Sequence, residues 1–145
     1  MLPKTDWAGL IPHAGSMCLL DAVLDWDDDA IHAVSASHAR ADNPLRGARG
    51  LHAIHLAEYG AQAMAVHGAL LTRRQGATTP RAGRLVSLRD VRLFAVYVEQ
   101  LDGRLDVHAQ CLTADVGSAQ YAFRVEHHGQ LLLSGRAAVI HPAGA

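Results

Sequence analysis

Apolar and polar residues alternate along most of the chain, and the pattern changes in one central segment. Six stretches with this alternation predict β-strands: residues 19–26, 31–37, 85–98, 104–114, 119–127 and 130–140. Between the second and third of them, residues 51–71 are Ala-rich and free of proline, and apolar residues cover nearly the whole circumference of a helix. Because a helix that is apolar all round is buried on most sides, this one is expected in the core.

The predicted connections are short and polar. Asp27, Asp28 and Asp29 form a turn that makes the first two strands a hairpin. The breaks between the last four strands each contain a glycine, as hairpins need: Asp102-Gly103, Val116-Gly117 and His128-Gly129. These four strands are therefore predicted to form a meander. Residues 41–50 and 72–83 hold Pro, Gly and polar residues, and they are predicted to be loops.

This order of elements predicts a single α+β domain over residues 1–145. One helix cannot bury itself alone, so a strongly curved antiparallel sheet wrapped around it is the expected solution. Such a sheet leaves an exposed edge strand, and pairing of two edges in a dimer would cover it.

Composition excludes several classes of protein. With 50% hydrophobic residues, 19% charged residues and a net charge of −1, the chain gives no electrostatic reason to expect nucleic acid or an acidic membrane as partner. No apolar segment is both long and free enough of polar residues to predict a membrane span, and the first residues lack the pattern of a secretory signal. Cys18 and Cys111 lack metal-ligand spacing, so free thiols in a reducing cytoplasm are expected.

Four polar residues interrupt the predicted core helix on one side: His52, His55, Glu58 and Gln62. Their spacing of 3, 3 and 4 places them on one face. Three explanations remain open. The face contacts solvent or a dimer partner; the side chains bind a metal, although i, i+3, i+6 spacing spreads ligands apart; or a carboxyl is held in an apolar tunnel as a catalytic acid, where burial tunes its pKa. No metal site is expected.

Two motifs resemble a known family. Residues 58–64 (EYGAQAM) resemble the E-x-x-x-Q stretch on the central helix of bacterial 3-hydroxyacyl-[acyl carrier protein] dehydratases. Residues 11–21 (IPHAGSMCLLD) resemble their N-terminal L-P-H-x-x-P-(F/M)-L-L-x-D signature, with Ser16 in place of the second proline. Together with DNPLRGARG and AMAVHGALL, they are most similar to the dehydratase-like subfamily associated with aryl polyene pathways. The resemblance implies the hotdog fold, a long helix wrapped by an antiparallel sheet.

The sequence departs from these relatives near the helix. Their catalytic histidine lies in a G-H-F-P loop before the helix, whereas residues 41–50 contain no histidine and hold Asn43-Pro44-Leu45 instead. At the predicted helix start, His52 replaces a proline and Ala53 replaces a glycine.

The resemblance implies dehydration of a 3-hydroxyacyl thioester. The acyl group would be carried on phosphopantetheine of an acyl carrier protein, without a further cofactor, and a homodimer or a heterodimer with a second hotdog subunit is implied. Glu58 is the predicted acid, and His13 is the first candidate for the base. A histidine packed at the start of a strand is the plain alternative for His13. The further base candidates, in order, are His55, His52 and His38.

Three further roles follow from the resemblance. Backbone N–H groups around His52 and Ala53 are expected to stabilise the thioester oxygen. Gln62 is expected to orient Glu58 by an i, i+4 hydrogen bond. The arginines of the basic linker either attract the carrier or its phosphate or are simply solvated: Arg73, Arg74, Arg81 and Arg84.

Two other functions remain open. In a hotdog thioesterase, a carboxylate on the same helix acts as base or nucleophile, so Glu58 alone does not separate the two activities. The chain is alternatively a non-catalytic partner subunit of a dehydratase heterodimer, which the absence of the loop histidine favours.

Overall fold

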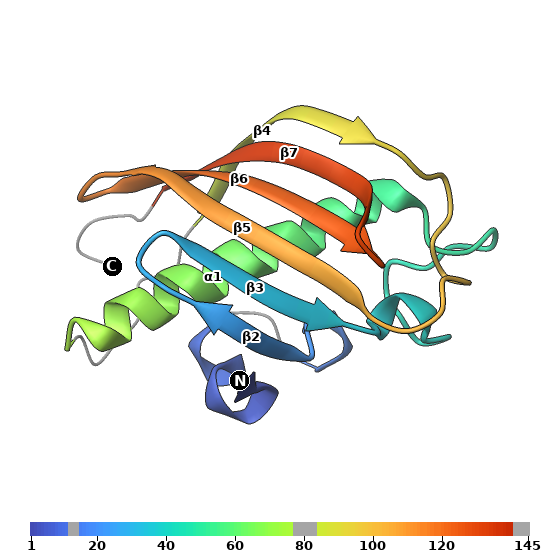
Figure 1. Cartoon of the computed structure of the whole chain (residues 1–145), viewed down its shortest axis with the longest axis horizontal. Coiled ribbons are helices and arrows are strands. Elements are labelled where there is room, and N and C mark those ends of the chain that lie inside the picture. Colours follow the sequence, from blue (N-terminus) through green and yellow to red (C-terminus); the bar gives the residue numbers. More distant parts are fainter. Residues whose placement is uncertain (12–14, 77–83, 141–145) are drawn as a thin grey trace.

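The computed structural model describes residues 1–11, 15–76 and 84–140, in which one long helix lies against a curved antiparallel sheet (Figure 1). The described strands are β1 (Leu2–Pro3), β2 (Ala22–Trp26), β3 (Ala30–Ser35), β4 (Arg84–Leu93), β5 (Leu105–Ala114), β6 (Ser118–His127) and β7 (Gln130–Ile140). Their order in the sheet is β1-β2-β3-β5-β6-β7-β4. The long helix is α1 (Leu56–Arg74), and a short 3-10 helix, η5 (Ala53–His55), precedes it.

The helix predicted over 51–71 is confirmed, with shifted ends. Residues 51–53 are held by backbone hydrogen bonds to residues 96 and 98, and His52 forms an isolated bridge with Tyr97. This pairing keeps the chain extended until η5 begins. At the other end α1 continues to Arg73 and Arg74, whose positive charges suit the negative end of the helix dipole.

The first predicted hairpin is confirmed. The carboxylate of Asp27 accepts hydrogen bonds from the backbone N–H groups of Asp29 and Ala30, both at 2.8 Å, which closes the turn between β2 and β3. These two bonds lower the pKa of the Asp27 carboxyl, because they favour its charged form.

The expected meander of four strands is wrong at its first step. β5, β6 and β7 are consecutive neighbours, but β4 pairs with β7 and not with β5. The break at Asp102-Gly103 therefore lies in a connection that crosses from the β4 edge to the inside of the sheet. This connection occupies residues 94–104, which is much longer than a tight hairpin turn.

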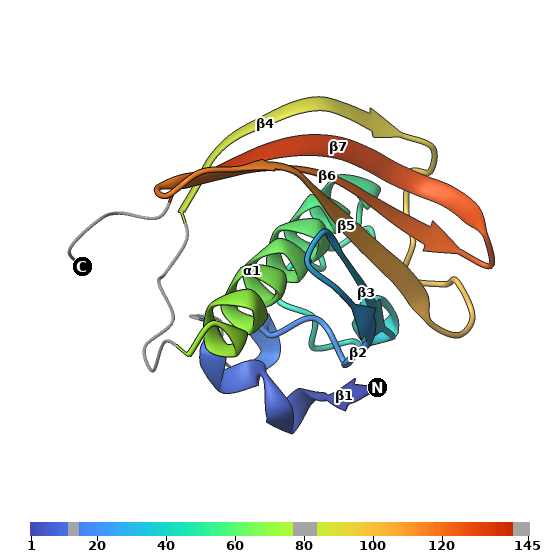
Figure 2. The ribbon, with the colours of Figure 1, turned by 60° about the vertical axis from the view of Figure 1, so that its left-hand side comes forward.

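The sheet and the N-terminal segment enclose α1 from opposite sides (Figure 2). The sheet arches over the helix, while η1 (Lys4–Asp6) and η2 (Ala8–Leu10) lie below it. Trp7, between these two turns, is fully buried. On β6 the predicted alternation is confirmed, because Phe123 and Val125 are buried on the helix side and Arg124 is exposed on the outer face.

Two glycines make room for one aromatic ring between α1 and the sheet. A Cβ atom at Gly60 on α1 would overlap the Phe123 ring, and one at Gly135 on β7 would lie 2.8 Å from Phe123 Cζ. The ring therefore fits only because neither residue carries a side chain.

Two further expectations can be compared with the structure. Cys18 and Cys111 are free cysteines, as predicted. Among the described residues, no helix is long and apolar enough to cross a membrane.

Candidate functional site

The structure brings most of the predicted site residues to the start of α1. Glu58 lies in the first turn of this helix, while His52, Ala53 and His55 belong to η5 or directly precede it. Glu58, His52 and His55 are half-buried in the isolated chain. The polar face therefore borders the surface, and only Gln62 at its far end is fully buried.

The ring of His52 is held in a defined orientation. Its Nδ1 accepts a hydrogen bond of 3.0 Å from the N–H of Ile54, and its ring forms a T-shaped contact with the Tyr97 ring at 5.5 Å between centroids. Since Nδ1 is the acceptor, the proton of the neutral ring sits on Nε2. His52 can therefore donate a hydrogen bond from Nε2 while its other nitrogen caps η5.

The backbone N–H of Ala53 is engaged within the chain. It donates to the carbonyl oxygen of Val96 at 2.7 Å. An N–H group used in this way is not free to donate a hydrogen bond to a thioester oxygen. The structure therefore does not support the expected role of the Ala53 N–H in stabilising that oxygen.

Gln62 ties the helix to the second half of the N-terminal signature, residues 11–21. Its Nε2 donates to the carbonyl oxygen of Met17 at 2.6 Å, and its Oε1 accepts from the N–H of Leu19 at 2.8 Å. Both polar atoms of this buried side chain thus bind backbone of residues 17–19 and anchor this segment on α1. The orientation of Glu58 by Gln62 stays a prediction.

His13 lies outside the described residues, as does Arg81. On either side of residues 12–14 the chain is anchored: Ile11 and Cys18 belong to the hydrophobic core, and Gly15–Met17 form the short helix η3. The assignment of His13 as base stays a prediction.

The loop without a histidine has a structural role. Asn43 is buried, and its Nδ2 donates to the Ser37 carbonyl at 2.9 Å and to the Tyr59 hydroxyl at 3.0 Å, while its Oδ1 accepts from Leu45 N–H at 2.9 Å. Tyr59 belongs to α1, so Asn43 fixes the loop on the helix. Burial raises the pKa of the Tyr59 hydroxyl, which therefore stays protonated and neutral.

His38 lies in the core, a position that does not favour it as the base. It is fully buried, and its Nε2 donates to the Leu101 carbonyl oxygen at 2.8 Å. Its Nδ1 is buried without a hydrogen-bond partner among the described residues. Burial lowers the pKa of His38, since the charged ring would lose its hydration.

A second buried histidine, His67, lies on α1 and was not predicted as a core residue from the sequence. The Nε2 of His67 donates to the Asp27 carbonyl at 2.8 Å, and its Nδ1 accepts from the Tyr121 hydroxyl at 2.7 Å. Burial lowers the pKa of His67 and raises that of Tyr121. The helical spacing gives a signal for it, because His67 shares the buried face with Ala63 and Leu70.

The arginines at the end of α1 are held by the chain itself. Arg74 forms an ion pair with Asp28 and lies over the Trp26 ring, 4.7 Å from its centroid. Arg73 donates to the Asp6 carbonyl oxygen at 3.1 Å. These contacts join α1 to the β2–β3 turn and to the N-terminal segment, so a structural role accounts for both residues.

Comparison with known proteins identifies the family. The model of the ApeP-like family, described as ApeP dehydratase, matches residues 5–145. The chain belongs to the ApeP-like family. Comparison with curated protein sequences gives no match.

Solved structures similar to this ApeP-like chain share its fold. The dehydratase heterocomplex ApeI:P from Xenorhabdus doucetiae has a TM-score of 0.84 at 22% identity, covering 99% of this chain and 93% of that chain. A hypothetical thioesterase with coenzyme A from Streptococcus pneumoniae has a TM-score of 0.63 at 10% identity, covering 96% of each chain. A mutant of the thioesterase SAV0944 from Staphylococcus aureus has a TM-score of 0.61 at 16% identity, covering 83% and 93%. The predicted hotdog fold is confirmed.

The ApeP-like chain exposes many large apolar side chains along the β4 edge of the sheet and at the start of α1. They lie on β4, on the segment after it and at the helix start: Leu85, Val86, Leu88, Leu93, Phe94, Val96, Tyr97 and Ile54. We call this set the β4 edge strip. Tyr97 contacts His52, so the strip is continuous with the polar site.

Proposed function

We propose that this chain dehydrates a 3-hydroxyacyl thioester, carried on the phosphopantetheine arm of an acyl carrier protein, to the trans-2-enoyl thioester. One observation carries the proposal: Gln62, one helical turn after Glu58, binds the backbone of Met17 and Leu19. This anchor draws the segment that follows His13 onto the helix that presents Glu58. Membership of the ApeP-like dehydratase family supports the same reaction.

The proposed reaction needs one base and one acid. The His13 imidazole removes a proton from C2 while the Glu58 carboxyl donates a proton to the leaving hydroxyl at C3. The C2–H and C3–O bonds break, the C2–C3 double bond forms, and water leaves. His13 then holds the proton from C2 and Glu58 is a carboxylate, so one proton transfer between them restores the starting state. His55, one turn before Glu58, is the second candidate for the base.

Charge that develops on the thioester oxygen requires a hydrogen-bond donor. The neutral His52 ring carries its proton on Nε2, because Nδ1 accepts a hydrogen bond from the Ile54 N–H. We assign this Nε2–H to the thioester oxygen. The Ala53 N–H would first have to leave the Val96 carbonyl.

We infer that a second hotdog subunit completes the site. Glu58, His52 and His55 are half-buried in the isolated chain, and the β4 edge strip beside them is exposed. A partner packed on this strip would remove apolar surface from water and enclose the polar face. The likeness to the ApeI:P heterocomplex favours a heterodimer over a homodimer.

The test follows the mass of the acyl group on the carrier. A carrier-linked 3-hydroxyacyl chain is incubated with the wild type, His13→Ala and Glu58→Gln, each alone and with a second hotdog subunit. The expected result is loss of one water, reduced at least about 100-fold by either substitution because each removes a proton-transfer group. His128→Ala and Asp42→Asn are the matched controls, and both should retain the wild-type rate.

Other results would favour the competing functions. Release of the free acid would indicate a thioesterase, an activity named for several structural neighbours. Dehydration only with the second subunit, unaffected by both substitutions, would indicate a non-catalytic partner. A rate in His13→Ala equal to that of the wild type would exclude His13 as the base and transfer the role to His55.

A further inference from the structure

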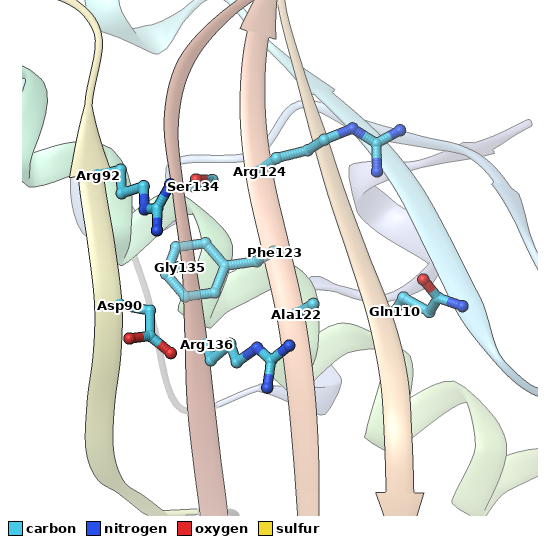
Figure 3. Close-up of a pocket in the computed structure, with 9 residues that line it drawn as sticks. All are labelled: Asp90, Arg92, Gln110, Ala122, Phe123, Arg124, Ser134, Gly135 and Arg136. Atoms are coloured by element: carbon cyan, nitrogen blue, oxygen red, sulfur yellow. The ribbon is translucent and has the colours of Figure 1, made fainter.

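The outer face of the sheet, opposite α1, carries a depression surrounded by arginines. Its volume is about 480 Å³, a size suited to a small ligand. Figure 3 shows that its lining comes from four adjacent strands: β4, β7, β6 and β5. Small residues, Ala122 and Ser134, form its floor, and the long side chains of Arg92, Arg124 and Arg136 rise around it.

A β-bulge in β4 collects arginines on this face. Arg89 lies opposite Arg136 and Arg92 opposite Ser134, with a register shift between them. In a regular strand, residues three apart point to opposite faces. The bulge inserts one extra residue, with Asp90 in a left-handed conformation at φ 55°, so that Arg89 and Arg92 both face outward.

The charges around the depression do not balance among the residues that the structure describes. Arg124 is neutralised by Glu126, at 3.4 Å. Arg89, Arg92 and Arg136 form no salt bridge among the described residues, and Asp90 is the one acidic residue that lines the depression. Among the lining residues, the two guanidinium groups of Arg92 and Arg136 and the carboxylate of Asp90 leave a charge of about +1, and Arg89 lies opposite Arg136 beside them. The opposed pair of Arg89 and Arg136 is in itself destabilising, since like charges face each other across neighbouring strands.

We propose that this depression binds a small ligand through a dianionic phosphate group. A phosphate monoester carries about −1.5 to −2 charges near neutral pH, opposite in sign to the excess charge of the arginines. Guanidinium groups bind phosphate oxygens with two parallel hydrogen bonds. In Figure 3 the Arg92 side chain extends from β4 towards β7, while Arg136 extends from β7 towards β6. A phosphate over Ser134 and Ala122 would lie between these two arginines.

Calorimetric titration of the full chain at constant ionic strength tests this site. Inorganic phosphate and adenosine monophosphate are the probes, with chloride as the reference anion. Saturable binding of phosphate at a 1:1 ratio is expected, and Arg136→Gln and Arg92→Gln should each weaken it about tenfold or more, the usual effect of one charge-assisted hydrogen bond. Tighter binding of adenosine monophosphate would identify an organic phosphate as the ligand, whereas equal binding would identify the free anion.

A second readout separates loss of the site from loss of the fold. Without phosphate, Arg136→Gln should unfold at the wild-type temperature or above it, because the substitution relieves repulsion with Arg89. Arg49→Gln, an exposed loop arginine, and Glu58→Gln are the matched controls and should bind phosphate as the wild type does. Absence of saturable binding, or unchanged phosphate affinity in Arg136→Gln and Arg92→Gln, would overturn the proposal without affecting the proposed dehydratase activity.

Discussion

At the scale of single residues, Gln62 has the clearest consequence for the site. It belongs to the polar face that helical spacing identifies, but its hydrogen bonds go to Met17 and Leu19, more than forty positions away in the sequence. Spacing along a helix predicts which residues share a face. It cannot predict which distant backbone group reaches that face, and this is why the sequence predicted the residue but not its partners.

We predict that Gln62→Leu lowers the free energy of unfolding by about 2 kcal/mol. The change keeps the volume similar but leaves the buried Met17 carbonyl and Leu19 N–H without their partner, and each such group costs about 1–3 kcal/mol. Urea unfolding measures the loss. Gln120→Leu, on an exposed position of β6, is the control and should change stability by less than about 0.5 kcal/mol. Equal stability of the two variants would contradict the anchoring role.

The other polar groups around the site follow the same rule. Asn43, Ser37 and Tyr59 form one buried hydrogen-bond network, yet they come from a loop, a short 3-10 helix and α1. Each residue alone is unremarkable in the sequence, because the network exists only once the loop has folded onto the helix. The absence of a loop histidine is read directly from the sequence, whereas the anchoring function of Asn43 became clear only from the structure.

At the scale of elements, alternation located the strands well and their pairing less well. The predicted strands correspond to β2 through β7, and the two tight hairpins among the last strands join neighbours. β4 was misplaced because alternation reports which face a strand buries and carries no information on its neighbour. Its pairing with β7 depends on a long connection, residues 94–104, which also contacts the start of α1.

The contact of α1 with the sheet yields a prediction for Gly60→Ala. In a free helix this change is stabilising by up to about 1 kcal/mol. Here the added Cβ overlaps the Phe123 ring, which Gly135 confines from the other side, so we expect a net loss of about 1–3 kcal/mol from overpacking. Thermal unfolding measures this loss.

The Phe123→Leu variant, whose side chain is smaller than the phenyl ring, provides the control for that prediction. In the double variant the leucine leaves room for the added methyl, so the cost of Gly60→Ala should be smaller in the Phe123→Leu background than in the wild type. Equal cost in both backgrounds would show that the ring does not limit this position.

At the scale of the whole molecule, the two faces of the sheet have different chemistry. The inner face holds α1 with Glu58 at its start, beside the exposed β4 edge strip. The outer face holds the arginines of the depression and two stacked histidines, His32 and His108, at 4.2 Å between ring centroids. The proposed acyl substrate and second subunit would occupy one side, which would leave the outer face available to the proposed phosphate ligand.

The buried histidines predict that the chain is less stable in mild acid. Burial lowers the pKa values of His38, His67 and His108 below the ordinary value of about 6.5, and nearby Arg124 adds to the effect at His108. Well above pH 6.5 these rings are neutral in both states, whereas at about pH 6.5 the rings of the unfolded chain are half protonated. As the pH falls below this value, the unfolded chain binds protons that the folded chain excludes, so the free energy of unfolding decreases until the folded pKa values are reached.

Urea unfolding at pH 8.0, 6.5 and 5.5 measures this dependence. We expect a small decrease from pH 8.0 to 6.5 and a larger decrease at pH 5.5, with at most about 1.4 kcal/mol per pH unit from each histidine. His67→Gln should be less stable at pH 8.0, because it disturbs the bonds to Asp27 and Tyr121, yet it should lose less on acidification. A variant with the same acid dependence as the wild type would show that His67 takes up its proton as readily in the fold as in the unfolded chain.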